Sequence, residues 1–81
     1  MASRPLLLMT RERLDLRGVK CPLSWAHARI RLEAMSTGDE LELLLDDAQA
    51  ATDIPRAAEA SGHHVVAVVP EPPLWRIVIE A

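Results

Sequence analysis

The sequence has few aromatic residues and a single cysteine, and both scarcities exclude classes of function. Among 81 residues there are two Trp and no Phe or Tyr, so stacked aromatic platforms for single-stranded nucleic acid are not expected. Cys21 is the only cysteine, which excludes an intramolecular disulfide and a zinc site built from several cysteines. The histidines His27, His63 and His64 show no ligand spacing with it. We therefore expect no metal and no cofactor.

Long apolar runs are also missing. The run from Pro5 to Met9 is too short for the hydrophobic region of a signal peptide, and charged residues follow it. No stretch reaches the roughly 20 apolar residues of a transmembrane helix. We therefore expect a cytoplasmic protein that does not bind membranes and whose thiol stays reduced.

The length and the apolar content of 49% indicate one small globular domain. Such a chain buries only about 60–65% of the surface that its unfolded form exposes, so its core is modest and a shallow active group is expected. We expect residues 1–10 to form a flexible N-terminal segment and residues 11–81 to form a single domain.

The net charge of −3 is unevenly distributed. Residues 16–32 contain no acidic side chain, whereas residues 39–59 contain seven acidic side chains against Arg56. The basic residues around the cysteine are Arg17, Lys20, Arg29 and Arg31. They are either a chance group of solvated charges or a positive rim that steers an anionic substrate or an acidic partner toward Cys21.

Hydrophobic periodicity and turn residues predict the order β-α-β-α-β-β. Strands are expected at residues 11–16, 40–45, 64–69 and 74–79. The first helix is expected over residues 22–35. The second is expected to have Thr52 or Asp53 as its N-cap, with Pro55 in its first turn. The Asp46-Asp47 pair is either an acidic surface for a partner or, as we prefer, a strand end with a capping role.

The tight turn at residues 70–73 predicts that the last two strands are antiparallel. The fold class is therefore an α/β two-layer sandwich (α+β), with a four-stranded mixed sheet and two helices on one face.

The first helix has two apolar stripes, although a helix on a sheet needs only one. One stripe comprises Trp25, Ala28, Leu32 and Met35, and the other comprises Leu23, Ala26, Ile30 and Ala34. The second stripe either faces solvent or binds a partner. Its candidate partner-binding residues are Leu23, Ala26 and Ile30.

Cys21 is followed directly by Pro22. Proline is favoured in the first turn of a helix, so Cys21 is predicted at a helix N-terminus, where free N–H groups and the helix dipole favour a thiolate. With Lys20 and Arg17 nearby, we expect the pKa of the thiol to be lowered. A buried structural cysteine is the alternative, and the position between Lys20 and Pro22 argues against it.

Several short motifs occur in a characteristic order. They are Leu14-Asp15-Leu16-Arg17-Gly18, Cys21-Pro22, Gly38-Asp39, Asp46-Asp47, Asp53-Ile54-Pro55 and Gly62-His63. On these residues the chain resembles the TusA/SirA-like sulfurtransferase family from about Leu14 to Ile79. The family's Cys-Pro-x-Pro motif has Ser24 in place of its second proline here. Ser24 either donates a hydrogen bond to the sulfur or is a neutral replacement.

The resemblance implies a two-layer α/β sandwich and a sulfurtransferase that is a carrier rather than a stand-alone catalyst. Cys21 would hold sulfane sulfur as a persulfide. It would receive that sulfur from a cysteine desulfurase or a rhodanese-like donor and pass it to an acceptor protein in tRNA thiolation or sulfur metabolism. The residues expected to support Cys21 are Arg17, Gly18, Lys20, Pro22 and Ser24.

Two other functions stay open. One is a non-catalytic interaction or regulatory module that docks through the first helix. The other is a nucleic-acid-binding domain, suggested by the basic segment around Cys21. The negative net charge and the scarcity of aromatic residues disfavour the second, so no stable nucleic-acid binding is expected.

Overall fold

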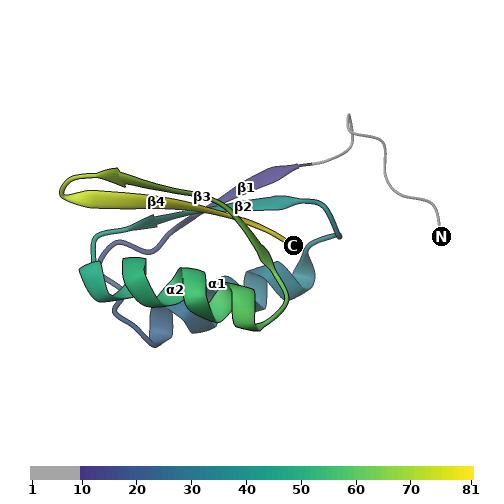
Figure 1. Cartoon of the computed structure of the whole chain (residues 1–81), viewed down its shortest axis with the longest axis horizontal. Coiled ribbons are helices and arrows are strands. Elements are labelled where there is room, and N and C mark those ends of the chain that lie inside the picture. Colours follow the sequence, from purple (N-terminus) through teal and green to yellow (C-terminus); the bar gives the residue numbers. More distant parts are fainter. Residues whose placement is uncertain (1–9) are drawn as a thin grey trace.

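The computed structural model describes residues 10–81. The segment 1–10, expected to be flexible, lies outside the described residues except for Thr10. Six elements follow one another in the predicted order β-α-β-α-β-β (Figure 1). They are β1 (Arg11–Asp15), α1 (Leu23–Ala34), β2 (Glu40–Leu45), α2 (Ala48–Ala60), β3 (His64–Glu71) and β4 (Leu74–Glu80).

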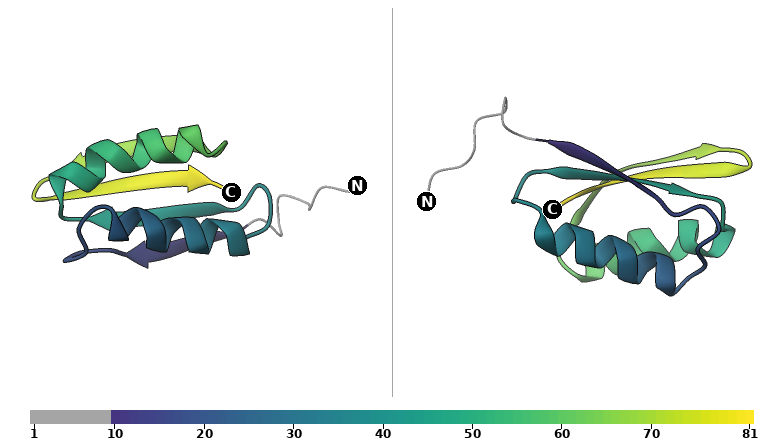
Figure 2. Two further views of the ribbon diagram at one scale, coloured as in Figure 1. Left: turned by 90° about the horizontal axis from the view of Figure 1, so that it is seen from below. Right: turned by 180° about the vertical axis from the view of Figure 1, so that it is seen from behind.

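The four strands form one mixed sheet in the order β1-β2-β4-β3. β1 and β2 are parallel, while β4 is antiparallel to both of its neighbours. Both helices cover the same face of the sheet, with α1 over β2 and α2 over β4 and β3 (Figure 2). The predicted two-layer sandwich and the predicted antiparallel pair at the C-terminal end are therefore confirmed.

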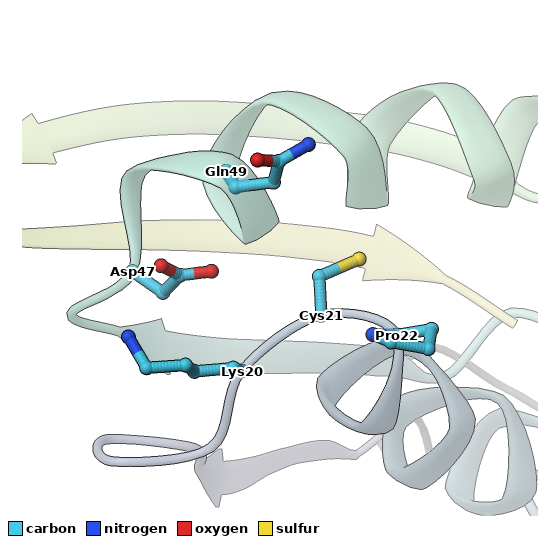
Figure 3. A pocket seen from close by; sticks show the side chains of 5 residues that line it. All are labelled: Lys20, Cys21, Pro22, Asp47 and Gln49. Carbon is cyan, nitrogen blue, oxygen red and sulfur yellow. The ribbon is translucent and has the colours of Figure 1, made fainter.

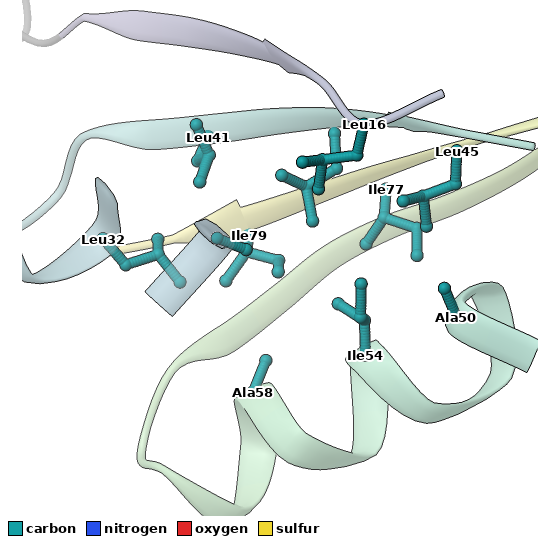
Figure 4. Close-up of a cluster of buried hydrophobic side chains, with 11 residues drawn as sticks. Leu16, Leu32, Leu41, Leu45, Ala50, Ile54, Ala58, Ile77 and Ile79 are labelled. Atoms are coloured by element: carbon teal, nitrogen blue, oxygen red, sulfur yellow. The ribbon is translucent and has the colours of Figure 1, made fainter. Parts of the chain in front are cut away.

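The core lies between this face of the sheet and the two helices (Figure 4). Because side chains alternate along a strand, Leu41, Leu43 and Leu45 all face the helices and are fully buried. Burial of each such side chain stabilises the fold by about 1.5–3 kcal/mol. Nine other hydrophobic residues are also buried: Leu16, Ala28, Leu32, Ala50, Ile54, Ala58, Ile77, Val78 and Ile79.

The two stripes of α1 have different surroundings. Ala28 and Leu32 are buried, and Trp25 and Met35 pack against the core, so this stripe faces the sheet as predicted. The opposite stripe, which we call the outer stripe, consists of Leu23, Ala26, Ile30 and Ala34, and all four are exposed. The exposed fraction is 64% for Leu23 and 68% for Ile30.

The second helix begins earlier than predicted. α2 starts at Ala48, and its N-cap is Asp47, whose carboxylate accepts a hydrogen bond of 3.1 Å from the N–H of Ala50. The prediction that Thr52 or Asp53 caps this helix is wrong, and Pro55 lies inside the helix. Ala and Gln at residues 48–51 are strong helix formers, so the helix extends back to the first available cap. The preferred capping role of the Asp46-Asp47 pair is confirmed for Asp47.

Candidate functional site

Two loops, residues 16–22 after β1 and residues 46–47 after β2, meet at one end of the strands. Since β1 and β2 are parallel, the loops that follow them emerge at the same end of the sheet. The N–H of Gly18 in the first loop donates to both carboxylate oxygens of Asp46 in the second, at 2.9 and 3.1 Å. Gly18 has a φ of 82°, a conformation that favours glycine. This contact holds together the two loops from which α1 and α2 start.

Cys21 lies just before the N-terminus of α1, next to the N-cap. Pro22 is the N-cap residue and Leu23 is the first helical residue. The N–H of Ser24 bonds to the carbonyl of Lys20 at 3.1 Å, which closes a turn around the cysteine. The Cys21–Pro22 peptide bond is cis. The N-cap at Pro22 confirms the predicted position of Cys21 at a helix N-terminus.

The thiol of Cys21 is half-buried at the margin of the core. Its side chain projects from the turn toward α2 (Figure 3). It forms one wall of an open cleft of about 440 Å³ lined by Lys20, Cys21, Pro22, Asp47 and Gln49. A small reactant or a side chain of another protein can therefore reach the sulfur from solvent.

A carboxylate of α2 lies beside the sulfur. Sγ of Cys21 lies 4.0 Å from Oδ2 of Asp53, at the long end of a hydrogen bond to sulfur. Nε2 of Gln49 donates to the same oxygen at 3.1 Å. Asp47 adds a second carboxylate in the wall of the cleft. The sulfur thus faces negative charge from α2 and from its N-cap.

The pKa of the Cys21 thiol is raised above its ordinary value. Burial is the largest cause, and the carboxylates of Asp53 and Asp47 add to it because they disfavour a neighbouring thiolate. The expectation of a lowered pKa is wrong. The N-terminus of α1 acts in the opposite direction, but its effect is only about 0.3–1 kcal/mol.

The positive rim, one of the two alternatives for the basic residues around Cys21, is mostly neutralised by acidic partners. Arg17 binds Asp15 at 2.7 Å, and this ion pair lowers the pKa of Asp15 to about 2. Arg31 binds Glu12 at 2.7 Å, and Arg29 binds Glu33 at 3.3 Å. Of the four basic residues in this segment, only Lys20 forms no ion pair within residues 10–81, and it lines the cleft.

Ser24 lies in the first turn of α1 with its side chain fully buried. Its Oγ has no hydrogen-bond partner in the part of the chain that the structure describes. The hydrogen bond from Ser24 to the sulfur, one of the two alternatives, is therefore not formed here. The other alternative, a neutral replacement of proline, stays a prediction.

Gln49 and Asp53 were missed as neighbours of Cys21. They are four residues apart, so they share one face of α2. The four-residue spacing of Gln49 and Asp53 is visible in the sequence, but it places them on one helix face only if the helix begins at Ala48.

The histidines do not line the cleft. Within residues 10–81, no group of three or more His, Cys, Asp or Glu side chains is placed to hold a metal ion. Neither α1 nor α2 is long and apolar enough to cross a membrane.

Comparison with known proteins gives a match to the family described as Sulfurtransferase TusA over residues 12–81. The chain belongs to this family. Relatives carrying the name of a sulfur carrier protein occur in Archaeoglobus fulgidus and Neisseria meningitidis serogroup A. One A. fulgidus protein is 39% identical over 57 residues, which cover 70% of this chain and 65% of the relative.

A second A. fulgidus relative is 34% identical over 83% of this chain and 92% of its own length. The N. meningitidis relative is 31% identical over 89% of this chain and 97% of its own length. The fold resembles a SirA-like protein from Desulfitobacterium hafniense, with a TM-score of 0.73 and 20% identity over 90% of this chain and 97% of that one. The TusA family and the names of these relatives support a role in sulfur transfer.

Proposed function

We propose that the protein carries sulfane sulfur as a persulfide on Cys21 and relays it from a donor protein to an acceptor protein. The position of the cysteine carries this proposal. It is the only thiol in the chain, and it forms the wall of an open cleft at the start of α1. Another protein's sulfur can reach Sγ there without any opening of the fold.

The relay needs two exchanges of the same kind. The Cys21 thiolate attacks the outer sulfur of a donor persulfide, R–S–SH, forming the Cys21 S–S bond and breaking the donor's S–S bond. The donor leaves as the thiolate R–S⁻. An acceptor thiolate then attacks the outer sulfur on Cys21, and the Cys21 thiolate leaves. Each step transfers one sulfur atom and needs no external oxidant or reductant, and the thiolate is the reactive form in both.

The donor in this proposal is a cysteine desulfurase or a rhodanese-like protein, and the acceptor belongs to tRNA thiolation or sulfur metabolism in the cytoplasm. Both would dock beside α1. A protein interface covers about 800 Å² on each partner, and Leu23 and Ile30 are only about 10 Å apart along the helix axis. A partner seated on Cys21 would therefore also cover Leu23, Ala26 and Ile30.

Mass spectrometry tests the relay. The full chain is incubated with a cysteine desulfurase and cysteine, or with a rhodanese and thiosulfate, and its intact mass is measured. We expect a gain of one sulfur atom that dithiothreitol removes and that Cys21→Ser abolishes. If neither donor produces the adduct on folded protein, the relay is refuted.

A docking role for the outer stripe predicts a separate result. Ile30→Asp should slow sulfur loading by a protein donor by about tenfold or more, because it places a charge in an apolar contact. Ala60→Asp introduces the same charge at the far end of α2 and should load at the wild-type rate. Equal rates for the two variants would show that the donor does not use this stripe.

A non-catalytic interaction module is the second candidate, and the exposed outer stripe favours it. In that case a partner would bind the Cys21→Ser variant as tightly as the wild type, and no persulfide would form. Isothermal titration with a candidate partner, combined with the mass measurement, separates the two functions.

A further inference from the structure

Asp53 has no role in the relay as described, yet its carboxylate faces the reactive sulfur. It lies inside α2, so it does not cap the helix. Oδ2 is 4.0 Å from Sγ of Cys21 and accepts a hydrogen bond of 3.1 Å from Nε2 of Gln49. Gln49 therefore fixes the carboxylate on the side that faces the cysteine.

We propose that Asp53 is a positioning residue that holds Cys21 in its thiol form, so that the free protein is a weak nucleophile until a partner changes the charge beside it. The S–H group would donate to Oδ2 of Asp53, and this contact is lost when the thiol ionises. The biological meaning of this inference rests on the proposed sulfur relay.

The charges that face Cys21 come from three segments. Lys20 adjoins it in its own loop, Asp47 faces it from the N-cap of α2, and Asp53 faces it from inside that helix. Two carboxylates thus oppose one ammonium group. Two other charged groups nearby have partners elsewhere. Asp46 accepts a hydrogen bond from the N–H of Gly18, and Arg17 forms an ion pair with Asp15.

No basic side chain within residues 10–81 forms an ion pair with Asp47 or Asp53. Because a thiolate reacts with oxidants and with any sulfane sulfur it meets, a protonated Cys21 would be protected between transfers. A donor or acceptor that brings a Lys or Arg side chain beside Asp53 would cancel the carboxylate's effect. The thiol would then ionise in the complex, where the attack takes place.

The test measures the rate at which iodoacetamide alkylates Cys21 in the full chain as a function of pH. Only the thiolate reacts, so the midpoint of the pH profile reports the pKa of the thiol. We expect Asp53→Asn to move the midpoint down by about one pH unit, which makes alkylation at pH 7 about tenfold faster. An unshifted midpoint in folded Asp53→Asn protein would overturn the proposal.

Three controls separate this local effect from general ones. Glu59→Gln removes one charge from an exposed position on the same helix and should leave the midpoint unchanged. A shift equal to that of Asp53→Asn would reduce the effect to net charge and overturn the proposal. Asp53→Glu keeps the carboxylate and should retain most of the wild-type midpoint. Wild-type protein unfolded in urea gives the reference midpoint, which Asp53→Asn would reach if it had lost its fold.

Alkylation uses no sulfur donor, so its result is independent of the persulfide experiment. If the midpoint shifts but no persulfide forms, the relay fails and the role of Asp53 in keeping Cys21 in its thiol form stands. If persulfide forms but the midpoint does not shift, the relay stands and the role of Asp53 fails.

Discussion

The hydroxyl of Ser24 is buried without a hydrogen-bond partner among the described residues. Burial of an unpaired hydroxyl costs about 1–3 kcal/mol, and replacing it with an apolar group of similar shape removes that cost. We predict that Ser24→Ala raises the free energy of unfolding by about 1 kcal/mol, as measured by urea denaturation. A loss of stability would show that Oγ has a partner, such as an ordered water molecule.

The raised pKa of Cys21 makes stability depend on pH in a defined direction. The folded state binds the thiol proton more tightly than the unfolded state does. The resulting stabilisation is present below the ordinary thiol pKa of about 8.5 and is lost as the pH rises through the folded-state value. We predict that the wild type loses more stability than Cys21→Ser between pH 7 and pH 10, measured by urea denaturation at each pH. Parallel losses in the two proteins would contradict this prediction.

At the scale of residues, the sequence predicts where Cys21 lies but not the charge that it meets. Pro22 marks the helix start, and local rules are sufficient for that prediction. Asp53 is 32 residues further along the chain, and the packing of α2 beside α1 brings it to the sulfur. A prediction from the cations adjacent in sequence, Lys20 and Arg17, therefore gives the wrong direction for the pKa of Cys21.

Among the elements, α2 depends on Asp47 for its start. The carboxylate accepts the hydrogen bond from the N–H of Ala50, and loss of such a cap costs about 1 kcal/mol. We predict that Asp47→Ala lowers the melting temperature by about 4–8 °C, as measured by circular dichroism. Asp47→Ser retains a capping oxygen without the charge and should restore most of the loss. If both variants melt alike, the contribution of Asp47 is not capping.

The ends of five elements could be predicted closely, and the start of α2 could not. The four strands and α1 lie within two residues of their expected ends, because alternation and turn residues mark them clearly. For α2, two patterns conflict. Pro55 is typical of a first turn, whereas residues 48–51 favour helix and follow a good cap. The second pattern is correct, since one missing backbone hydrogen bond at Pro55 is offset by another turn of helix packed on the core.

At the scale of the whole molecule, the two edge strands of the sheet, β1 and β3, differ in charge. β1 carries four charged residues among five, which protects an edge from pairing with other chains. β3, at the other edge, contains an uncharged run of valine and alanine from Val65 to Val69, with Val66, Val68 and Val69 exposed. Exposed, uncharged and β-branched segments of an edge strand are sites of aggregation.

We predict that Val68→Lys reduces aggregation on heating by severalfold, as measured by light scattering at several protein concentrations. The melting temperature should change by only a few degrees, because the Val68 side chain is 46% exposed. Ala60→Lys changes the net charge equally at an exposed position on α2 and should aggregate like the wild type. Equal protection by both variants would assign the effect to net charge instead of the edge.

The C-terminal residue is held at the end of β2 that is remote from Cys21. The N–H of Ala81 donates to the carbonyl of Asp39, and its carbonyl accepts from Gly38. The six residues of β2 separate this point from the loop that faces the cysteine by about 17 Å. A fluorophore or a surface tether attached at Ala81 would therefore leave the thiol accessible. The molecule is thus suited to immobilisation with Cys21 facing the solution, where the exchange of single sulfur atoms could be followed in real time.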